Sequence, residues 1–223
     1  MERFFDIVLS LIAVLVLSPL FLVVMVFLKL SGEGEIFYFQ SRVGKNGIKF
    51  KLIKFATMLK NSENIGTGTI TVSNDPRVLP FGKFLRRTKI NELPQLFNII
   101  LGDMSIVGPR PQTERCFNAF PIKSQNVIKK MKPGLSGLGS LVFRNEDQMM
   151  ADNSNANQFY DETIMPYKGA IEEYFFMHKS FADYFKIILL TILIMVFPKS
   201  TNINFFYNNL PKAPEALKKY ILL

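Results

Sequence analysis

The longest apolar run of the chain lies near its N-terminal end, from Ile7 to Leu28, and contains no charged residue. At about 1.5 Å per residue, an α-helix over this run would extend roughly 33 Å, enough to cross the hydrocarbon core of a bilayer. No signal-peptide cleavage site follows it, so we expect the helix to be retained in the membrane. Residues 1–30 are therefore predicted to form a membrane helix.

A Ser-Pro pair, Ser18-Pro19, lies in the middle of this run. Proline removes a backbone donor and clashes with the preceding turn. The helix is therefore either kinked while it spans the bilayer or broken so that it returns to the side from which it entered. Because basic residues flank both ends, at Arg3 and Lys29, the positive-inside rule gives no orientation. The apolar pattern leaves both alternatives open.

Two further apolar segments lie near the C-terminal end. The run from Ile187 to Phe197 is too short to span a bilayer, so it is a core helix or a helix in the membrane interface. The segment from Pro214 to Leu223 is either a short interfacial helix or a frayed terminus.

The polar part begins with a predicted β-hairpin from Glu35 to Met58. Residues rich in β-formers, Ile36–Phe39 and Ile48–Ile53, flank an Asn46-Gly47 pair, which is a strong turn signal. The polar stretch from Asn61 to Asp75 is predicted to be a loop.

Helices are expected over most of the remaining chain. A basic helix is predicted over Phe81–Lys89. A second helix is predicted to start at Asn91 as its N-cap, with Pro94 in the first turn and an apolar face that continues to Gly102. The pattern from Asp161 to Phe197 is also mostly helical. The fold class is therefore α-rich α+β with one small hairpin.

Charge narrows the classes of partner. The chain has 223 residues and a net charge of +9, which favours phosphate esters, nucleic acid or anionic lipid. The one histidine, His178, excludes a multi-histidine metal site, and the one cysteine, Cys116, excludes an internal disulfide. Both are expected to be structural. Acid–base chemistry would then depend mostly on carboxylates.

The candidate chemistry lies in the middle of the chain. Basic residues of the Phe81–Lys89 helix either steer an anionic substrate or face solvent and lipid headgroups. Glu92 is either a partner of the helix dipole or an oxygen ligand for Mg²⁺. Arg110, between two prolines, either grips a phosphate or lies exposed in a turn. The segment from Lys132 to Gly139 is an anion cradle or a flexible loop.

Five motifs follow one another along the chain: Asp75-Pro76-Arg77, Phe81–Arg86, Asn91–Asn98, Gly102–Pro111 and Lys132–Gly137. In this order they closely resemble the bacterial sugar transferases of the monotopic phosphoglycosyl transferase superfamily, in the minimal single-domain form. The resemblance covers about residues 3–191. It implies a helical catalytic domain over 31–200 with interfacial amphipathic helices, and a tail over 201–223 that lies at the membrane interface in one interpretation.

The resemblance implies a reaction and a location. A phosphosugar would pass from a UDP-sugar to polyprenyl (undecaprenyl) phosphate, giving polyprenyl-diphosphate-sugar and UMP. This is the first membrane step of bacterial polysaccharide, O-antigen or glycoprotein glycan assembly. The N-terminal helix would be re-entrant, broken at Ser18-Pro19, in the bacterial inner membrane with the catalytic domain on its cytoplasmic face. Membrane lipid is an expected partner, nucleic acid is not, and a homodimer is one of the oligomeric states left open.

The resemblance also implies roles for individual residues. The reaction would be a covalent two-step exchange with catalytic residues at the positions of Asn91, Glu92 and Arg110, and Glu92 would bind the cofactor Mg²⁺. The substrate-binding residues would be Lys54, Arg77, Arg86, Arg110, Pro111 and Arg144.

The chain departs from the family pattern at the nucleophile, because the expected aspartate is replaced by Asn91. Three explanations are open: another carboxylate such as Glu92 or Asp103 takes over, the chain is an inactivated variant, or it is a natural non-catalytic relative. Smaller departures are Ala56 and the segment Leu138-Gly139-Ser140.

The main alternative function is a non-catalytic membrane protein that binds nucleotide sugar or lipid phosphate. Nucleic-acid binding is supported by the net charge alone. The sequence does not name the sugar, and the Asn61–Asp75 loop is the first candidate for its recognition.

Overall fold

A computed structural model of the chain describes residues 1–64, 75–153, 155–197, 203–207 and 209–221. In chain order the elements are α1 (Glu2–Leu30), β1 (Phe37–Val43), η1 (Lys45–Gly47), β2 (Lys49–Phe55), η2 (Ser62–Asn64), α2 (Pro80–Arg87), η3 (Ile90–Glu92), α3 (Gln95–Leu101), β3 (Ser105–Val107), α4 (Glu114–Asn118), α5 (Ile122–Ile128), β4 (Gly134–Ser136), α6 (Leu138–Val142), α7 (Glu146–Ala151), α8 (Ala156–Phe159), η4 (Tyr160–Ile164), α9 (Met165–His178), α10 (Phe181–Val196), η5 (Ile203–Phe205) and α11 (Glu215–Lys218). The helix-rich class with a small two-stranded hairpin is confirmed.

The predicted hairpin forms from β1 and β2, which pair antiparallel with Phe37 opposite Phe55 and Val43 opposite Lys49. Asn46 and Gly47 adopt positive φ angles of 57° and 78° in the connecting turn. These left-handed conformations suit asparagine and glycine, so the turn signal in the sequence is explained.

A second sheet, which the sequence did not predict, joins β3 and β4 in parallel. A Cβ atom on Gly134 would lie 2.1 Å from the backbone nitrogen of Gly108, so glycine is required where the two backbones meet. The Gly134 N–H donates to the carbonyl of Pro109 at 2.8 Å. The Lys132–Gly139 segment is therefore not a flexible loop, because it forms a strand and the start of α6. Its interpretation as an anion cradle stays a prediction.

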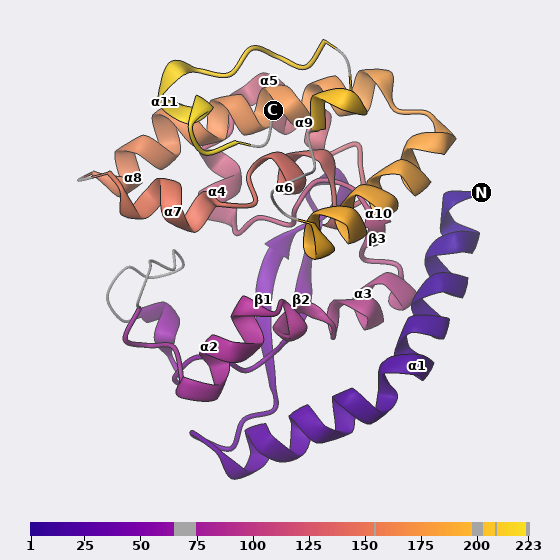
Figure 1. Cartoon of the computed structure of the whole chain (residues 1–223), viewed down its shortest axis with the longest axis vertical. Coiled ribbons are helices and arrows are strands. Elements are labelled where there is room, and N and C mark those ends of the chain that lie inside the picture. Colours follow the sequence, from indigo (N-terminus) through magenta and orange to yellow (C-terminus); the bar gives the residue numbers. More distant parts are fainter. Residues whose placement is uncertain (65–74, 154, 198–202, 208, 222–223) are drawn as a thin grey trace.

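Helix α1 is continuous but clearly bent, and it curves around one end of the molecule (Figure 1). Pro19 cannot donate to the carbonyl of Leu15, four residues earlier. The Ser18 hydroxyl donates to that carbonyl instead, at 2.8 Å. The Ser-Pro pair therefore accommodates the bend without leaving a carbonyl unpaired. Among the described residues, α1 is the one helix long and apolar enough to cross a membrane.

Both halves of α1 rest on the same protein body. In the first half, Arg3 donates to the carbonyls of Ile99 and Ile100 at the end of α3. Asp6 is buried beside β3 and α10. In the second half, Phe21, Val24 and Leu28 form a buried cluster with Phe55 of β2 and Leu85 of α2.

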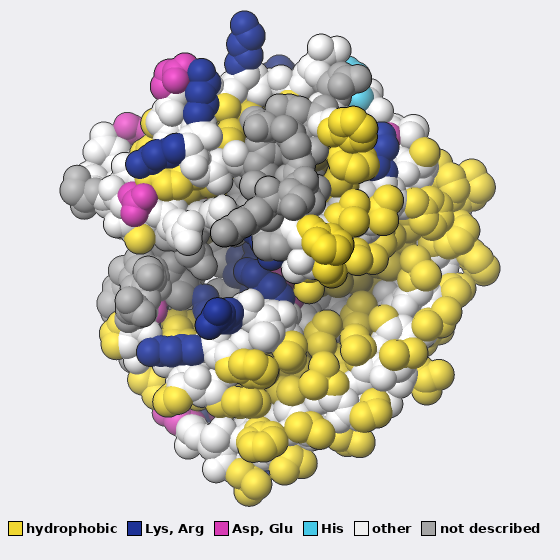
Figure 2. Space-filling view, in the orientation of Figure 1, with side chains coloured by type: hydrophobic (Ala, Val, Ile, Leu, Met, Phe, Trp, Pro, Cys, Tyr) yellow, Lys and Arg dark blue, Asp and Glu magenta, His cyan; other side chains and the backbone are white. Residues whose placement is uncertain are grey.

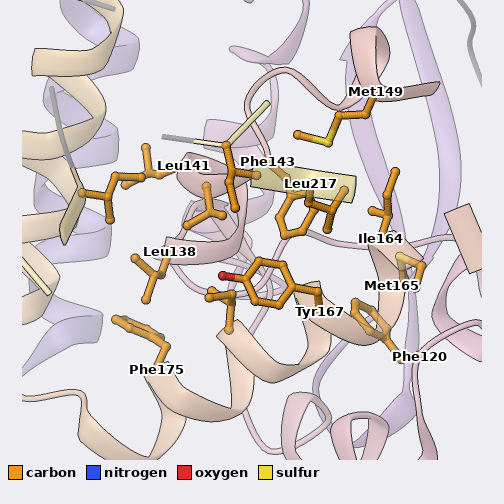
Figure 3. Packing of buried hydrophobic residues seen from close by; sticks show 14 of the residues in the cluster. Phe120, Leu138, Leu141, Phe143, Met149, Ile164, Met165, Tyr167, Phe175 and Leu217 are labelled. Carbon is orange, nitrogen blue, oxygen red and sulfur yellow. The ribbon is translucent and has the colours of Figure 1, made fainter. Parts of the chain in front are cut away.

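The main core lies at the opposite end, around α9 (Figures 1 and 3). Figure 3 shows Tyr167 and Phe175 of α9 packed toward Leu138 and Phe143 of the α6 segment. Leu217 of α11 is fully buried in this core, so the described part of the C-terminal segment, through Ile221, packs against the body rather than fraying.

The second apolar run lies in α10, which is amphipathic. Ile187, Leu190 and Ile194 are buried in the core, whereas Leu189 and Val196 are more than half exposed on the other face. The interpretation as a core helix is therefore confirmed for one face of α10, and the interfacial placement of its exposed face stays a prediction.

Candidate active site

The described residues enclose a cavity of about 940 Å³ between the hairpin, η3, α6 and α10. One side is positively charged, and we call Arg42, Lys54, Arg86, Lys89 and Arg110 the basic cluster. Another side is apolar, and we call Leu17, Ile106, Leu135, Ile188, Ile192 and Met195 the apolar wall. Figure 2 shows Lys and Arg side chains inside a hollow of this face, next to apolar side chains.

The turn η3 brings Asn91 and Glu92 to the cavity. Lys89 precedes it with a φ angle of 61°, which turns the chain sharply after α2. The following helix, α3, starts only at Gln95, with Pro94 in the N-cap position. The prediction that Asn91 caps this helix is therefore wrong, because Asn91 belongs to a separate 3₁₀ turn that precedes the helix. The side chain of Asn91 is consequently available to the cavity.

Glu92 is the acidic centre of the basic cluster. Its Oε1 atom lies 2.7 Å from Arg110 Nη2 and 3.7 Å from Lys54 Nζ, and the residue is 9% exposed. Burial by itself would raise the pKa of this carboxyl, but the charges of Arg110 and Lys54 outweigh burial and hold the pKa well below its usual range. Glu92 is therefore a buried carboxylate rather than a proton donor.

The surrounding cations are crowded. Burial lowers the pKa of Lys54 to about 7, opposed by Glu92 and reinforced by the charges of Arg110, Arg42 and Arg86. Burial and the charge of Arg110 also lower the pKa of Arg42, to about 10. Such a site gains from an anionic ligand, because added negative charge relieves the repulsion between the cations.

Asn91 is 6% exposed and borders the same cavity. Its Oδ1 atom is buried and has no hydrogen-bond partner among the described residues. A buried amide oxygen without a partner costs free energy, which is tolerated most readily where a ligand completes the site.

The structure brings most of the predicted site residues together. Lys54, Arg86, Arg110 and Arg144 line the cavity with Asn91 and Glu92. Arg144 donates to the carbonyl of Ile194 on α10. Pro111 is absent from the cavity lining, and its carbonyl accepts from Arg42 at 3.2 Å.

Two further predicted residues are absent from the cavity lining. Arg77 is buried and paired with Asp75, with 2.5 Å between Arg77 Nη2 and Asp75 Oδ2, and it is absent from the cavity lining. Asp103, one carboxylate proposed to replace the nucleophile, is also absent from the lining and accepts from Asn98 Nδ2 at 3.3 Å.

Sequence reasoning missed a polar face of β1. Tyr38, Gln40 and Arg42 alternate along this strand and all three line the cavity. Side chains two apart lie on the same face of a strand, so this spacing was the available signal. The stretch 65–74, within the predicted specificity loop, lies outside the described residues.

The oxygen atoms available in the cavity can be compared with those that Mg²⁺ requires. The described residues contain no group of three or more His, Cys, Asp or Glu side chains that could hold a metal. Mg²⁺ is commonly held by one or two carboxylates together with substrate phosphates. A single carboxylate, Glu92, with the unpartnered oxygen of Asn91 on the adjacent residue, fits this mode of binding.

Comparison with known proteins gives a family and named relatives. The family model for bacterial sugar transferases matches residues 1–198. Exopolysaccharide production protein ExoY of Sinorhizobium fredii is 39% identical over 159 residues, covering 65% of this chain and 70% of that protein.

Two longer relatives are named for sugar-phosphate transfer. The UDP-glucose:undecaprenyl-phosphate glucose-1-phosphate transferase of Escherichia coli is 40% identical over 139 residues, covering 61% of this chain and 30% of that protein. The UDP-N-acetylgalactosamine-undecaprenyl-phosphate N-acetylgalactosaminephosphotransferase of Aeromonas hydrophila is 37% identical over 143 residues, covering 63% and 34%. The match over residues 1–198 is nearly the whole chain. This chain therefore belongs to the bacterial sugar transferase family.

Proposed function

We propose that this protein transfers a phosphosugar from a UDP-sugar to polyprenyl phosphate and releases UMP. The observation that carries the proposal is Glu92, a buried carboxylate held by Arg110 and Lys54 in a cavity that also has an apolar wall. The names of the relatives from E. coli and A. hydrophila, which describe this type of transfer, support the same reaction.

The positively and negatively charged residues of the cavity would have different roles. The basic cluster would bind the diphosphate of the donor and the phosphate of the acceptor, with the planar fork of Arg110 suited to bidentate contact. Glu92 would hold Mg²⁺, which when bound neutralises charge on the phosphates. The relatives in exopolysaccharide production support a place in polysaccharide assembly. A covalent phosphosugar-enzyme, which the family resemblance implies, stays a prediction that needs a nucleophile where this chain has Asn91.

We further propose that α1 is re-entrant in the bacterial inner membrane and that the cavity faces the cytoplasm. Its two halves contact the same body, which supports entry and exit on one side. Single cysteines introduced by Glu2→Cys and Ser31→Cys should both react with an impermeant maleimide in inside-out vesicles, and neither should react in intact spheroplasts. Opposite sidedness of the two would show a spanning helix.

The reaction is tested by UMP release from several UDP-sugars with Mg²⁺ and undecaprenyl phosphate. We expect release with at least one sugar, dependent on the lipid phosphate. Absence of release from the unsubstituted chain across the panel would overturn the proposal.

A second candidate function is favoured by the neutral side chain of Asn91. A non-catalytic binder of nucleotide sugar would bind UDP-sugar without releasing UMP. It would gain release only in the Asn91→Asp variant, so the same side-by-side assay separates the two functions.

A further inference from the structure

Because this chain has Asn91 where the family resemblance implies a nucleophilic aspartate, we asked whether another carboxylate of the cavity could attack the donor. Three carboxylates line the cavity among the described residues: Glu35, Glu92 and Glu146. Each is held by a cation at short range. The distances are 2.5 Å from Glu35 Oε1 to Lys60 Nζ, 2.7 Å from Glu92 Oε1 to Arg110 Nη2, and 2.6 Å from Glu146 Oε2 to Lys168 Nζ.

Asn91 lies next to Glu92 in the cavity, but its side-chain amide cannot attack the donor to form an acyl phosphate. Asp103 is outside the described cavity lining. A carboxylate whose oxygen is held by a cation at this distance is drawn toward that cation and is a weaker nucleophile. The described part of the site therefore offers a phosphate-binding surface without an unpaired carboxylate to attack the donor.

The cavity has charge and room for two phosphate substrates at once. Its volume of about 940 Å³ is near the upper end of the roughly 300–1,000 Å³ found for ligand pockets. The five basic side chains of the basic cluster less the one charge of Glu92 leave a surplus of +4. A nucleotide sugar, with one charge on each phosphate, compensates part of this surplus, and a phosphate monoester adds about −1.5 to −2.

The apolar wall offers a surface for the lipid chain of the acceptor next to the basic cluster. Ile192 and Met195 of α10 line the cavity and are 54% and 58% exposed. A polyprenyl chain lying along this surface would therefore bring its phosphate directly to the basic cluster. Donor and acceptor would then meet while both are bound.

We infer that this chain transfers the phosphosugar in one displacement within a ternary complex, without a covalent enzyme intermediate. This inference rests on the proposed function. An oxygen of the lipid phosphate forms a bond to the β-phosphorus of the UDP-sugar. The bond from that phosphorus to the bridging oxygen breaks, and UMP leaves with the electron pair. No proton or further reactant is needed, because the attacking oxygen is already ionised and the bridging oxygen leaves as an ionised phosphate oxygen of UMP.

Asn91 then has a positioning role. Its neutral amide can donate to the transferred phosphate and, unlike a carboxylate, does not repel the incoming lipid phosphate. The substitution at this position would thus suit a direct attack by a dianionic acceptor.

The experiment uses the full chain in lipid nanodiscs with Mg²⁺ and the UDP-sugar that supports transfer. The first assay measures transfer to undecaprenyl phosphate. The second measures incorporation of radiolabelled UMP into UDP-sugar without any lipid phosphate, which requires a covalent intermediate. The third measures the intact mass of the protein after incubation with UDP-sugar alone, which detects an adduct on any residue. Asn91→Asp is compared with Asn118→Asp, the same change at an exposed position outside the described cavity lining.

We expect the unsubstituted chain to transfer with sequential kinetics, no UMP exchange above background and no mass adduct. Asn91→Asp should gain exchange at least tenfold above that background, and Asn118→Asp should not. Transfer accompanied by acceptor-independent exchange or by a phosphosugar adduct would overturn the inference and leave the proposed function intact. Absence of transfer would instead overturn the proposed function.

Discussion

Two opposing effects act on the carboxyl of Glu92 at the scale of a single residue. Burial penalises its charge, and the adjacent Arg110 and Lys54 favour it more strongly, so the site keeps a negative charge inside a basic cavity. Asp103 has the same chemistry but lies outside the cavity lining. Position, rather than residue type, therefore separates the candidate functional carboxylate, Glu92, from Asp103.

Glu92→Gln is expected to reduce UMP release about 100-fold or more, because it removes the one carboxylate of the basic cluster. The matched change Asp103→Asn should alter the rate less than about threefold. Steady-state UMP release at saturating Mg²⁺ measures both, and a larger loss in Asp103→Asn than in Glu92→Gln would contradict this assignment.

Glu172 gives a pH-dependent prediction. Burial raises the pKa of its carboxyl to about 7 from 4.5, opposed by Lys168 and the backbone N–H of Gly139. The folded protein therefore keeps a proton that the unfolded chain loses near pH 4.5, and stability falls as pH rises from about 4.5 to about 7. The shift corresponds to a cost on the order of 3 kcal/mol at pH 8. Glu172→Gln should raise Tm at pH 8 and change it little at pH 4.5.

The adjacent Glu173 is a control of opposite sign. Burial acts against its charge, but Lys123 and Ser124 lower the pKa of its carboxyl. Its contribution is present above the unfolded pKa and is lost as pH falls, so Glu173→Gln should lower Tm at pH 8. Calorimetry of both variants in detergent at the two pH values checks the pair, and shifts of the same sign at pH 8 would contradict the prediction.

At the scale of elements, α1 is attached to the body by polar contacts as well as by apolar packing. Asp6 is 2% exposed, and its Oδ1 accepts from the Ser105 hydroxyl, the Ile106 N–H and the Tyr184 hydroxyl at 3.0, 2.9 and 2.9 Å. A carboxylate within an apolar helix is costly unless its bonds are satisfied. This contact therefore specifies how α1 docks against β3 and α10.

Asp6→Ala is expected to lower stability by about 2–4 kcal/mol, because it leaves buried donors without an acceptor. The matched control is Asp152→Ala, which removes a Tyr220–Asp152 hydrogen bond of 2.7 Å at an exposed site. That change should cost about 0.5 kcal/mol or less. Denaturation in detergent measures both, and equal losses would show that Asp6 does not anchor the helix.

At the scale of the whole molecule, apolar side chains gather along α1 and α10 and form a broad yellow field in Figure 2. Leu15 and Val16 of α1 and Val196 of α10 are each more than 60% exposed. Apolar surface of this extent marks contact with a membrane or partner. Ile192 and Met195 belong both to the cavity lining and to the exposed apolar residues of α10, so the proposed soluble and lipid substrates would meet at one boundary.

A bilayer over this field should protect a cysteine at Val196→Cys from a water-soluble maleimide. Lys123→Cys, whose native side chain is 81% exposed and lies on α5, should react at least ten times faster in the same vesicles. The native Cys116 is buried and supplies the background rate. Similar rates for the two variants would contradict the proposed membrane face.

Sequence by itself determined the features that depend on neighbouring residues. The Asn46-Gly47 turn, the apolar run around Ser18-Pro19 and the order of the motifs around Glu92 are local, because turn chemistry and hydrophobic periodicity act over a few residues. Only the tertiary structure decided which distant groups meet. It added Arg42 to the basic cluster and left Arg77 and Asp103 outside the cavity lining.

The same distinction explains the second sheet and the docking of α1. The close approach of Gly108 to Gly134 and the hydrogen bond from Tyr184 to Asp6 join residues far apart in the chain. Such contacts depend on how whole elements pack, and one sequence without its fold does not specify them. Residue types therefore set the available chemistry here, and packing decided which residues share the site.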